Sequence, residues 1–153
     1  MRLVDSSMER GKPRILTVGS FDTPHLGHYS LMRQIKDLFP FSYLMVGVNR
    51  DDFIKQFKGK KPVLSYKERV KIISQIELVD EVFPNEGGAD SKILIKKVNP
   101  NVIAIGSDWL RKDYLKQMGF TAEWLESKAI ALIYIPRFLN VSTTLIKSMI
   151  RQK

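Results

Sequence analysis

One stretch near the start of the chain, residues 14–28, limits what the rest can fold into because it joins a buried strand directly to a helix. Its sequence is RILTVGSFDTPHLGH. The apolar run at residues 15–18 stops at Gly19, which is the pattern of a buried strand that ends in a turn. Pro24 suits the first turn of a helix, where its missing N–H would be unpaired anyway. The stretch therefore predicts a strand, a short polar turn and a helix N-terminus.

The predicted helix N-terminus is a natural site for phosphate. Its first N–H groups have no partner within the helix and carry partial positive charge, so a phosphate is stabilised there without any side chain. His25 and His28 add side-chain donors, and Gly27 between them lets a ligand approach the backbone closely. Two histidines with a carboxylate such as Asp22 could also hold zinc. The chain has no cysteine and no third histidine, so we place zinc well behind phosphate and predict no resident metal site.

Composition bounds the class of protein. A chain of 153 residues is large enough for one domain with a real core. The 25 Lys and Arg residues outnumber the 16 Asp and Glu residues, and the net charge of +9 favours polyanionic partners such as nucleotides, phosphorylated metabolites or nucleic acid. The absence of cysteine and of any apolar run of about 18 residues predicts a soluble cytoplasmic protein without a membrane span. Residues 1–13 lack hydrophobic periodicity and are expected to form a flexible arm before a domain at 14–153.

Apolar runs alternate with helical patterns along the rest of the chain. Continuous apolar runs are typical of strands covered on both faces, and a strand, helix, strand order makes neighbouring strands parallel. We therefore predict an α/β fold: a single Rossmann-like domain with a five-stranded parallel sheet flanked by helices on both faces. The strands expected after the first are residues 43–48, 80–83 (closed by Pro84), 102–105 and 129–135.

Caps and helical stripes mark the helices. Ser65 and Glu68 form a capping box, and the buried face that follows leaves Arg69 on another face. Residues 111–128 are expected to be helical, divided by Gly119 and capped again at Thr121. The apolar stripes predicted to be buried are Tyr29, Leu31, Met32, Ile35 and Leu38; Tyr66, Val70, Ile73 and Ile76; Ile93, Leu94 and Val98; and Leu145, Ile146, Met149 and Ile150.

Polar residues follow the predicted strand ends, and ligands of open parallel sheets bind at that edge. A lysine loop after the second strand holds Lys55, Lys58, Lys60 and Lys61, and its spacing fits a solvated surface and a ligand site about equally well. Trp109, after the fourth strand, is either core or, with Asp108, part of a base or ribose pocket. The hydroxyls at 142–144 follow Arg137, and an N-cap would explain Ser142 without a ligand, although the cluster favours a second phosphate site.

Four segments resemble the cytidylyltransferase-like nucleotidyltransferase superfamily, most closely the glycerol-3-phosphate cytidylyltransferases. They are GSFDTPHLGH, the lysine loop with SYKERVKII, VDEVFP with GSDW, and PRFLNVSTTLIK. The resemblance implies catalytic roles for His25, His28, Lys58, Lys60 and Arg137, with Lys58 or Lys60 bridging the two substrates. It also implies that the nucleotide is bound by Gly19, Ser20, Phe21, Asp22, Gly27, Gly106, Asp108, Trp109, Ser142 and Thr143.

The resemblance implies transfer of CMP from CTP to a small phosphorylated metabolite such as glycerol phosphate, with release of pyrophosphate. A phosphate oxygen of the acceptor attacks the α-phosphorus, so catalysis reduces to alignment and to stabilising charge on the phosphate oxygens. Mg²⁺ is expected to accompany the triphosphate. We also expect a homodimer.

Two departures from the family pattern keep alternatives open. The family reads Arg-Thr-Glu-Gly-Ile-Ser-Thr-Thr where residues 137–144 are RFLNVSTT, and Arg-Tyr-Val-Asp where residues 77–80 are ELVD. One alternative is an adenylyltransferase acting on a sugar phosphate or a pantetheine-like phosphate. The other is a non-catalytic nucleotide-binding or nucleic-acid-binding module. The aromatic residues fall in buried registers, which disfavours the nucleic-acid version.

Overall fold

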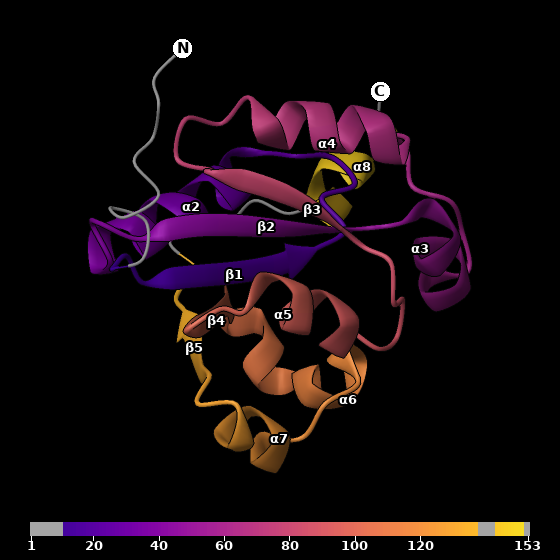
Figure 1. The fold of residues 1–153 in the computed structure, drawn as a ribbon. Helices are drawn as coiled ribbons and strands as arrows, with labels where there is room; N and C mark the ends of the chain where they lie inside the picture. Colours follow the sequence, from indigo (N-terminus) through magenta and orange to yellow (C-terminus); the bar gives the residue numbers. More distant parts are fainter. Residues whose placement is uncertain (1–10, 138–142, 152–153) are drawn as a thin grey trace.

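A parallel sheet with β1 (Arg14–Gly19) at its centre organises the fold (Figure 1). This computed structural model describes residues 11–137 and 143–151, except for the side chains of 143–146. Among the described residues five strands pair in the order β3-β2-β1-β4-β5, and every pair is parallel. The α/β fold predicted from the sequence is confirmed. The other strands are β2 (Tyr43–Asn49), β3 (Glu81–Asn85), β4 (Val102–Gly106) and β5 (Ala131–Ile135).

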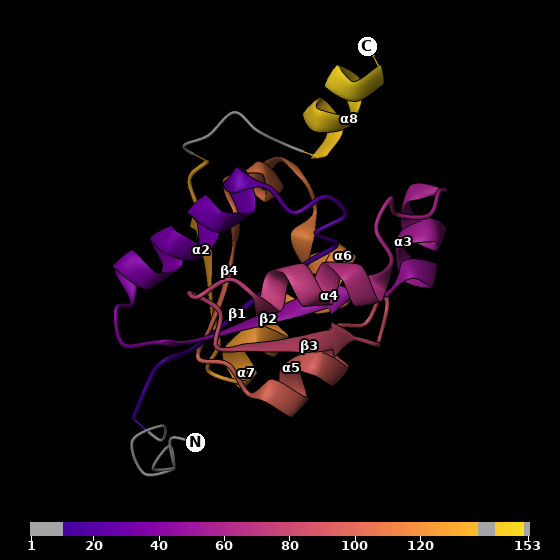
Figure 2. The same cartoon turned by 90° about the horizontal axis from the view of Figure 1, so that it is seen from above.

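Helices cover both faces of the sheet, as Figures 1 and 2 show. On one face lie α2 (Leu26–Leu38) and α4 (Tyr66–Ser74). On the other lie α5 (Lys92–Val98), α6 (Tyr114–Met118) and α7 (Ala122–Ser127). The remaining helical elements are α3 (Asp51–Lys58), the 3₁₀ helix η1 (Ser107–Arg111) and α8 (Thr143–Arg151). No helix in the described ranges combines the length and the apolar character needed to cross a bilayer.

Two hydrophobic cores, one on each face, explain why the strands are continuously apolar. Successive side chains of a strand point to opposite faces. Ile15 therefore packs with Met32 of α2, whereas the next residue, Leu16, belongs to the core that contains Leu94 and Val98 of α5. Because both faces of β1 are covered, its buried residues are apolar except for Thr17, which lines the cavity described below.

Two strand boundaries differ from prediction by two residues, and the others by one residue at most. Pro84 was expected to close the third strand but lies inside β3. Because β3 is an edge strand, a residue without an N–H costs the sheet no ladder bond on the open side. The fifth strand begins at Ala131, two residues later than expected, because Ala129 has a left-handed φ of 55° and belongs to the turn.

Several helical predictions are also wrong. Helix α2 begins at Leu26 with His25 as its N-cap, so Pro24 precedes the helix. Residues 111–128 hold the end of η1 and two short helices, divided at Gly119 and capped at Thr121 as predicted. In α8, which lies apart from the sheet in Figure 2, Met149 and Ile150 are exposed, and the side chains of Leu145 and Ile146 lie outside the described residues. Residues expected to be buried but exposed are Leu38, Ile93, Met149 and Ile150.

Candidate active site

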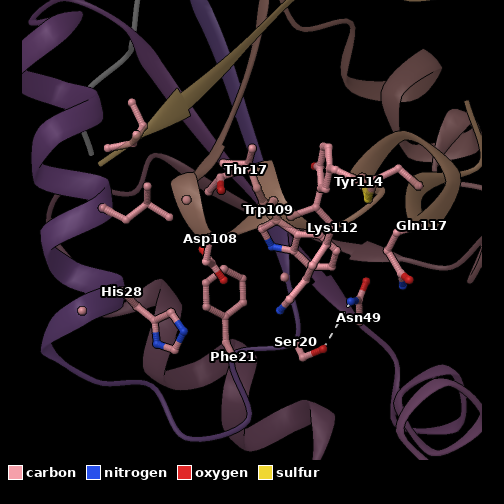
Figure 3. A pocket seen from close by; sticks show the side chains of 18 of the residues that line it. Thr17, Ser20, Phe21, His28, Asn49, Asp108, Trp109, Lys112, Tyr114 and Gln117 are labelled. Carbon is pink, nitrogen blue, oxygen red and sulfur yellow. Dashed lines mark hydrogen bonds between the residues drawn. The ribbon is translucent and has the colours of Figure 1, made fainter. Parts of the chain in front are cut away.

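A cavity of about 530 Å³ opens at the carboxyl edge of the sheet, where the polar strand ends meet (Figure 3). Lys60 is exposed and does not line it. Ser142 and the side chain of Thr143 lie outside the described residues, so their predicted contacts are not placed. The predicted site residues that do line the cavity are Gly19, Ser20, Phe21, Asp22, His25, Gly27, His28, Lys58, Gly106, Asp108, Trp109 and Arg137.

The two histidines form a capping box at the start of α2. His25 is the N-cap, and its Nδ1 accepts a hydrogen bond from the Gly27 N–H at 3.0 Å. The Nδ1 atom of His28 accepts from the His25 N–H at 3.2 Å. The rings stack with centroids 3.9 Å apart. An acceptor Nδ1 places the proton of a neutral imidazole on Nε2, so each ring keeps one N–H donor that the cap does not use.

The histidines are held in the neutral form. Burial first, and then the neighbouring His25, Arg137 and Lys58 groups, together lower the pKa of His28 to about 3. Burial, and then the charge of Arg137, also lower the pKa of His25. The negative charge of a bound triphosphate would act in the opposite direction and raise both pKa values. In the substrate-free protein, His28 is thus a hydrogen-bond donor and not an acid.

We expect the substrate-free protein to lose stability as the pH falls below about 6.5, where a histidine of the unfolded chain becomes protonated. Folded His28, with a pKa of about 3, binds no proton over most of this range. The unfolded state then binds more protons, so acid lowers the free energy of unfolding. Urea unfolding at pH 7.5 and 5.5 measures the drop. His28→Asn should show a smaller drop, and an equal drop in both proteins would contradict this assignment.

The turn between β1 and α2 is strained and firmly anchored. Phe21 is buried with a left-handed φ of 49°, which is uncommon for a bulky residue and is typical of functional turns. Asp22 accepts from the Val63 N–H at 2.5 Å and pairs with Lys147 of α8. Burial alone would raise the pKa of Asp22, but the hydrogen bonds from Lys147 and the Val63 backbone outweigh it and hold the pKa low. The turn is thereby tied to two distant segments.

Positive side chains gather around the cavity. Lys58 is in the last turn of α3 and, unlike the other residues of the lysine loop, lines the cavity. Partial burial lowers its pKa, and Asp22 acts against that shift. Arg137 follows β5, and its Nη1 lies 3.9 Å from Oδ2 of Asp108. The arrangement suits a polyanion such as a triphosphate.

Trp109 lies between the core and the cavity, so its core position is confirmed, while its part in a base or ribose pocket stays a prediction. It packs against the core below the sheet and lines the cavity. Its ring meets Tyr114 edge to face at 5.3 Å, and Nζ of Lys112 stands 5.0 Å from its centroid. A half-buried aromatic that is fixed on one side and open on the other can hold a flat ligand group.

The sequence interpretation missed Arg69. This side chain was expected on another face of α4 but is fully buried, with an exposed fraction of 0%. Its guanidinium donates to the Ser20 carbonyl at 2.5 Å, to the Asp51 carboxylate at 2.6 Å and to the Leu64 carbonyl at 3.1 Å. Arg69 therefore ties the turn between β1 and α2 to the start of α3 and to the segment before α4. A local helical pattern carries no sign of acceptors that come from three other segments.

The match to a known family decides the class. The model described as cytidylyltransferase-like matches residues 16–149. The chain belongs to the cytidylyltransferase-like family. A glycerol-3-phosphate cytidylyltransferase of Bacillus spizizenii is 38% identical over 88% of this chain and 94% of its own. An FAD synthase of Thermococcus sibiricus is 33% identical over 75% of this chain and 80% of its own.

A solved structure has a similar fold. A lipopolysaccharide core biosynthesis protein from Thermoplasma volcanium matches with a TM-score of 0.61 and 29% identity, over 80% of this chain and 97% of its own. Because the family model and relatives named glycerol-3-phosphate cytidylyltransferase and FAD synthase match most of the chain, the protein is a nucleotidyltransferase of the cytidylyltransferase-like family. In the described part of the chain, no cluster of three or more His, Asp or Glu side chains could hold a metal ion.

Proposed function

We propose that this cytidylyltransferase-like protein transfers CMP from Mg-CTP to a small phosphorylated metabolite of the glycerol phosphate type. The observation that carries the proposal is the neutral histidine pair, whose Nε2–H donors share one cavity with Lys58 and Arg137. Such donors stabilise charge that develops on phosphate oxygens during transfer. Mg²⁺ enters as part of the triphosphate substrate and is held mainly by its phosphates. The metal and the expected homodimer stay predictions.

The proposed step needs no covalent intermediate and no redox partner. An oxygen of the acceptor's phosphate dianion forms a bond to the α-phosphorus of the triphosphate. The bond from the α-phosphorus to the bridging oxygen breaks, and pyrophosphate leaves with that electron pair. Because the attacking phosphate carries no proton, no general base is required, and the side chains contribute alignment and charge.

Two observations bear on the choice of substrates. The 38% identity with a glycerol-3-phosphate cytidylyltransferase supports CTP and a small phosphate. Relatives named FAD synthase form an adenine-containing product, so adenylyl transfer from ATP is the second candidate. The non-catalytic alternative has no comparable support, because the glycerol-3-phosphate cytidylyltransferase and the FAD synthase carry the names of enzymes.

A pyrophosphate-release screen tests the proposal by pairing each of the four triphosphates with phosphorylated polyols, sugars and aminoalcohols. We expect release with Mg-CTP and a polyol phosphate. Lys58→Ala should then lower turnover by roughly 10²-fold, the usual scale for losing one donor to the transition state. Lys60→Ala tests whether the second predicted lysine contributes to turnover. Lys55→Ala is the matched control, because Lys55 is exposed on α3 and does not line the cavity. Release with Mg-ATP alone would favour adenylyl transfer, and no release with any pair would contradict both.

A further inference from the structure

Asp22 carries a negative charge in a place where the proposed substrate is itself a polyanion. The residue lines the cavity together with His25, His28 and Lys58, yet it is only 5% exposed. Burial would raise its pKa, but hydrogen bonds from Lys147 and from the backbone outweigh burial, so the carboxylate is ionised at neutral pH. A bare carboxylate beside a triphosphate would repel it. The charge of Asp22 therefore has to be balanced within the protein.

Both oxygens of the Asp22 carboxylate accept hydrogen bonds from other parts of the chain. Oδ1 accepts from the backbone N–H groups of Val63 at 2.5 Å and of Leu64 at 3.4 Å. Oδ2 accepts from Nζ of Lys147. With both oxygens engaged and little surface exposed, this carboxylate is better placed to hold segments together than to bind a ligand.

The three segments that meet at Asp22 all border the proposed phosphate site. The first is the turn between β1 and α2, which leads into the histidine cap. The second is the chain that follows α3 and Lys58, and it contributes the two backbone donors. The third is α8, which bears Lys147 at its centre and stands clear of the sheet in Figure 2. Because the sheet does not support α8 directly, the ion pair with Asp22 helps to decide where this helix lies.

The ion pair is close enough to the cavity to act on its charged groups. Burial lowers the pKa of Lys58; Asp22 opposes this shift, whereas Lys147 adds to it. The two members of the pair thus act on Lys58 in opposite directions. A phosphate bound near Lys58 would accordingly meet a neutralised pair and not a free carboxylate.

We propose that Lys147 is a positioning residue for the triphosphate: it neutralises Asp22 and holds α8 against the turn, while Asp22 joins the three segments without touching the nucleotide. The inference rests on the proposed transferase function, because the triphosphate is the substrate of that reaction. Removing Lys147 leaves the carboxylate bare beside the phosphates and repels them. Neutralising Asp22 as well abolishes that repulsion.

The test is calorimetric titration with Mg-CTP and, separately, with Mg-ATP, together with steady-state pyrophosphate release. Lys147→Met keeps most of the side chain but removes its charge. We expect Kd and KM for the triphosphate to rise roughly tenfold or more, the scale of one lost hydrogen bond between charged groups, with the KM for the acceptor unchanged. Lys147→Arg restores the charge and should recover most of the affinity. Lys147→Gln, which can still donate to Asp22, gives the same comparison if Lys147→Met does not fold.

Asp22→Asn is then added to Lys147→Met. Asparagine can still accept from the Val63 N–H through its amide oxygen but carries no charge. The double variant should bind the triphosphate more tightly than Lys147→Met alone, because the repulsion is gone. The titration is made well below the melting temperatures, so the recovery reports the charge at the site and not the stability of the fold.

Lys36→Met is the matched control. Nζ of Lys36 lies 2.8 Å from Oδ2 of Asp80, and the Lys36 side chain is 17% exposed, against 20% for Lys147. Asp80 also accepts from a backbone N–H, that of Leu44, at 2.7 Å. This pair lies near the start of β2 and does not line the cavity. Lys36→Met should therefore lower the melting temperature and leave the affinity for the triphosphate unchanged.

The outcomes separate the inference from the function beneath it. Unchanged affinity in Lys147→Met, or no recovery in the double variant, would overturn the inference while the transferase function stands. An equal loss of affinity in Lys36→Met would overturn it too, since any half-buried ion pair would then have the same effect. If the wild-type protein bound neither triphosphate, the proposed function and the inference would be lost together.

Discussion

Replacing His28 with alanine is expected to lower turnover by about 10²–10³-fold, the usual result of removing one preorganised donor to a transition state. The Nε2–H of His28 is the donor, because Nδ1 is engaged in accepting from the His25 N–H at 3.2 Å. The affinity for the triphosphate should change much less, since the helix N-terminus and the positive side chains still bind its phosphates. Single-turnover kinetics together with nucleotide titration separate the two effects.

Alanine also removes the cap, so a second variant is needed. His28→Asn can keep an acceptor near the position of Nδ1 but has no group at Nε2. It should melt close to the wild-type temperature and still show most of the loss in turnover. Normal turnover in His28→Asn would show that the ring acts only as a cap.

Replacing Arg69 with leucine is expected to destabilise the protein by roughly 2–6 kcal/mol, the range for leaving two carbonyl groups without a donor at about 1–3 kcal/mol each. The change removes the partner of Asp51 and strips the Ser20 and Leu64 carbonyls of their donor. Urea unfolding measures the loss. Arg69→Lys should recover only part of it, because one ammonium cannot reproduce the planar fork of a guanidinium.

A matched surface change separates this effect from the loss of any arginine. Arg33 lies on α2 and faces Glu77 at 3.9 Å, with both side chains largely exposed. Exposed pairs of this kind contribute about 0–1 kcal/mol, so Arg33→Leu should change stability little. Equal losses in the two variants would contradict the anchoring role of Arg69.

The architecture could be predicted because its signals are local. Gly19 ends a strand, Ser65 with Glu68 starts a helix, and Gly119 divides the segment after β4, each within a few residues. Parallel strands share a carboxyl edge, so His28 and Arg137 could be expected around one site, and both line the cavity. Their catalytic roles stay predictions.

The interactions that the sequence did not reveal join residues far apart along the chain. Asp22 and Lys147 form an ion pair across 125 residues, and no periodicity connects them. The same holds for the acceptors of Arg69. The exposure of Met149 and Ile150 also escaped prediction, because an amphipathic pattern shows which side of α8 is apolar but not whether the fold covers that side.

The central place of β1 has a consequence for the newly made chain. The first strand to be synthesised gains β2 and then β3 on one side, but the strand for its other side, β4, begins only at Val102. Until then, an apolar strand has one row of backbone N–H and C=O groups open to any extended neighbour, which is a template for aggregation. A chain that ends before β4 therefore leaves one edge of β1 unpaired, and we expect such fragments to aggregate more readily than the full chain.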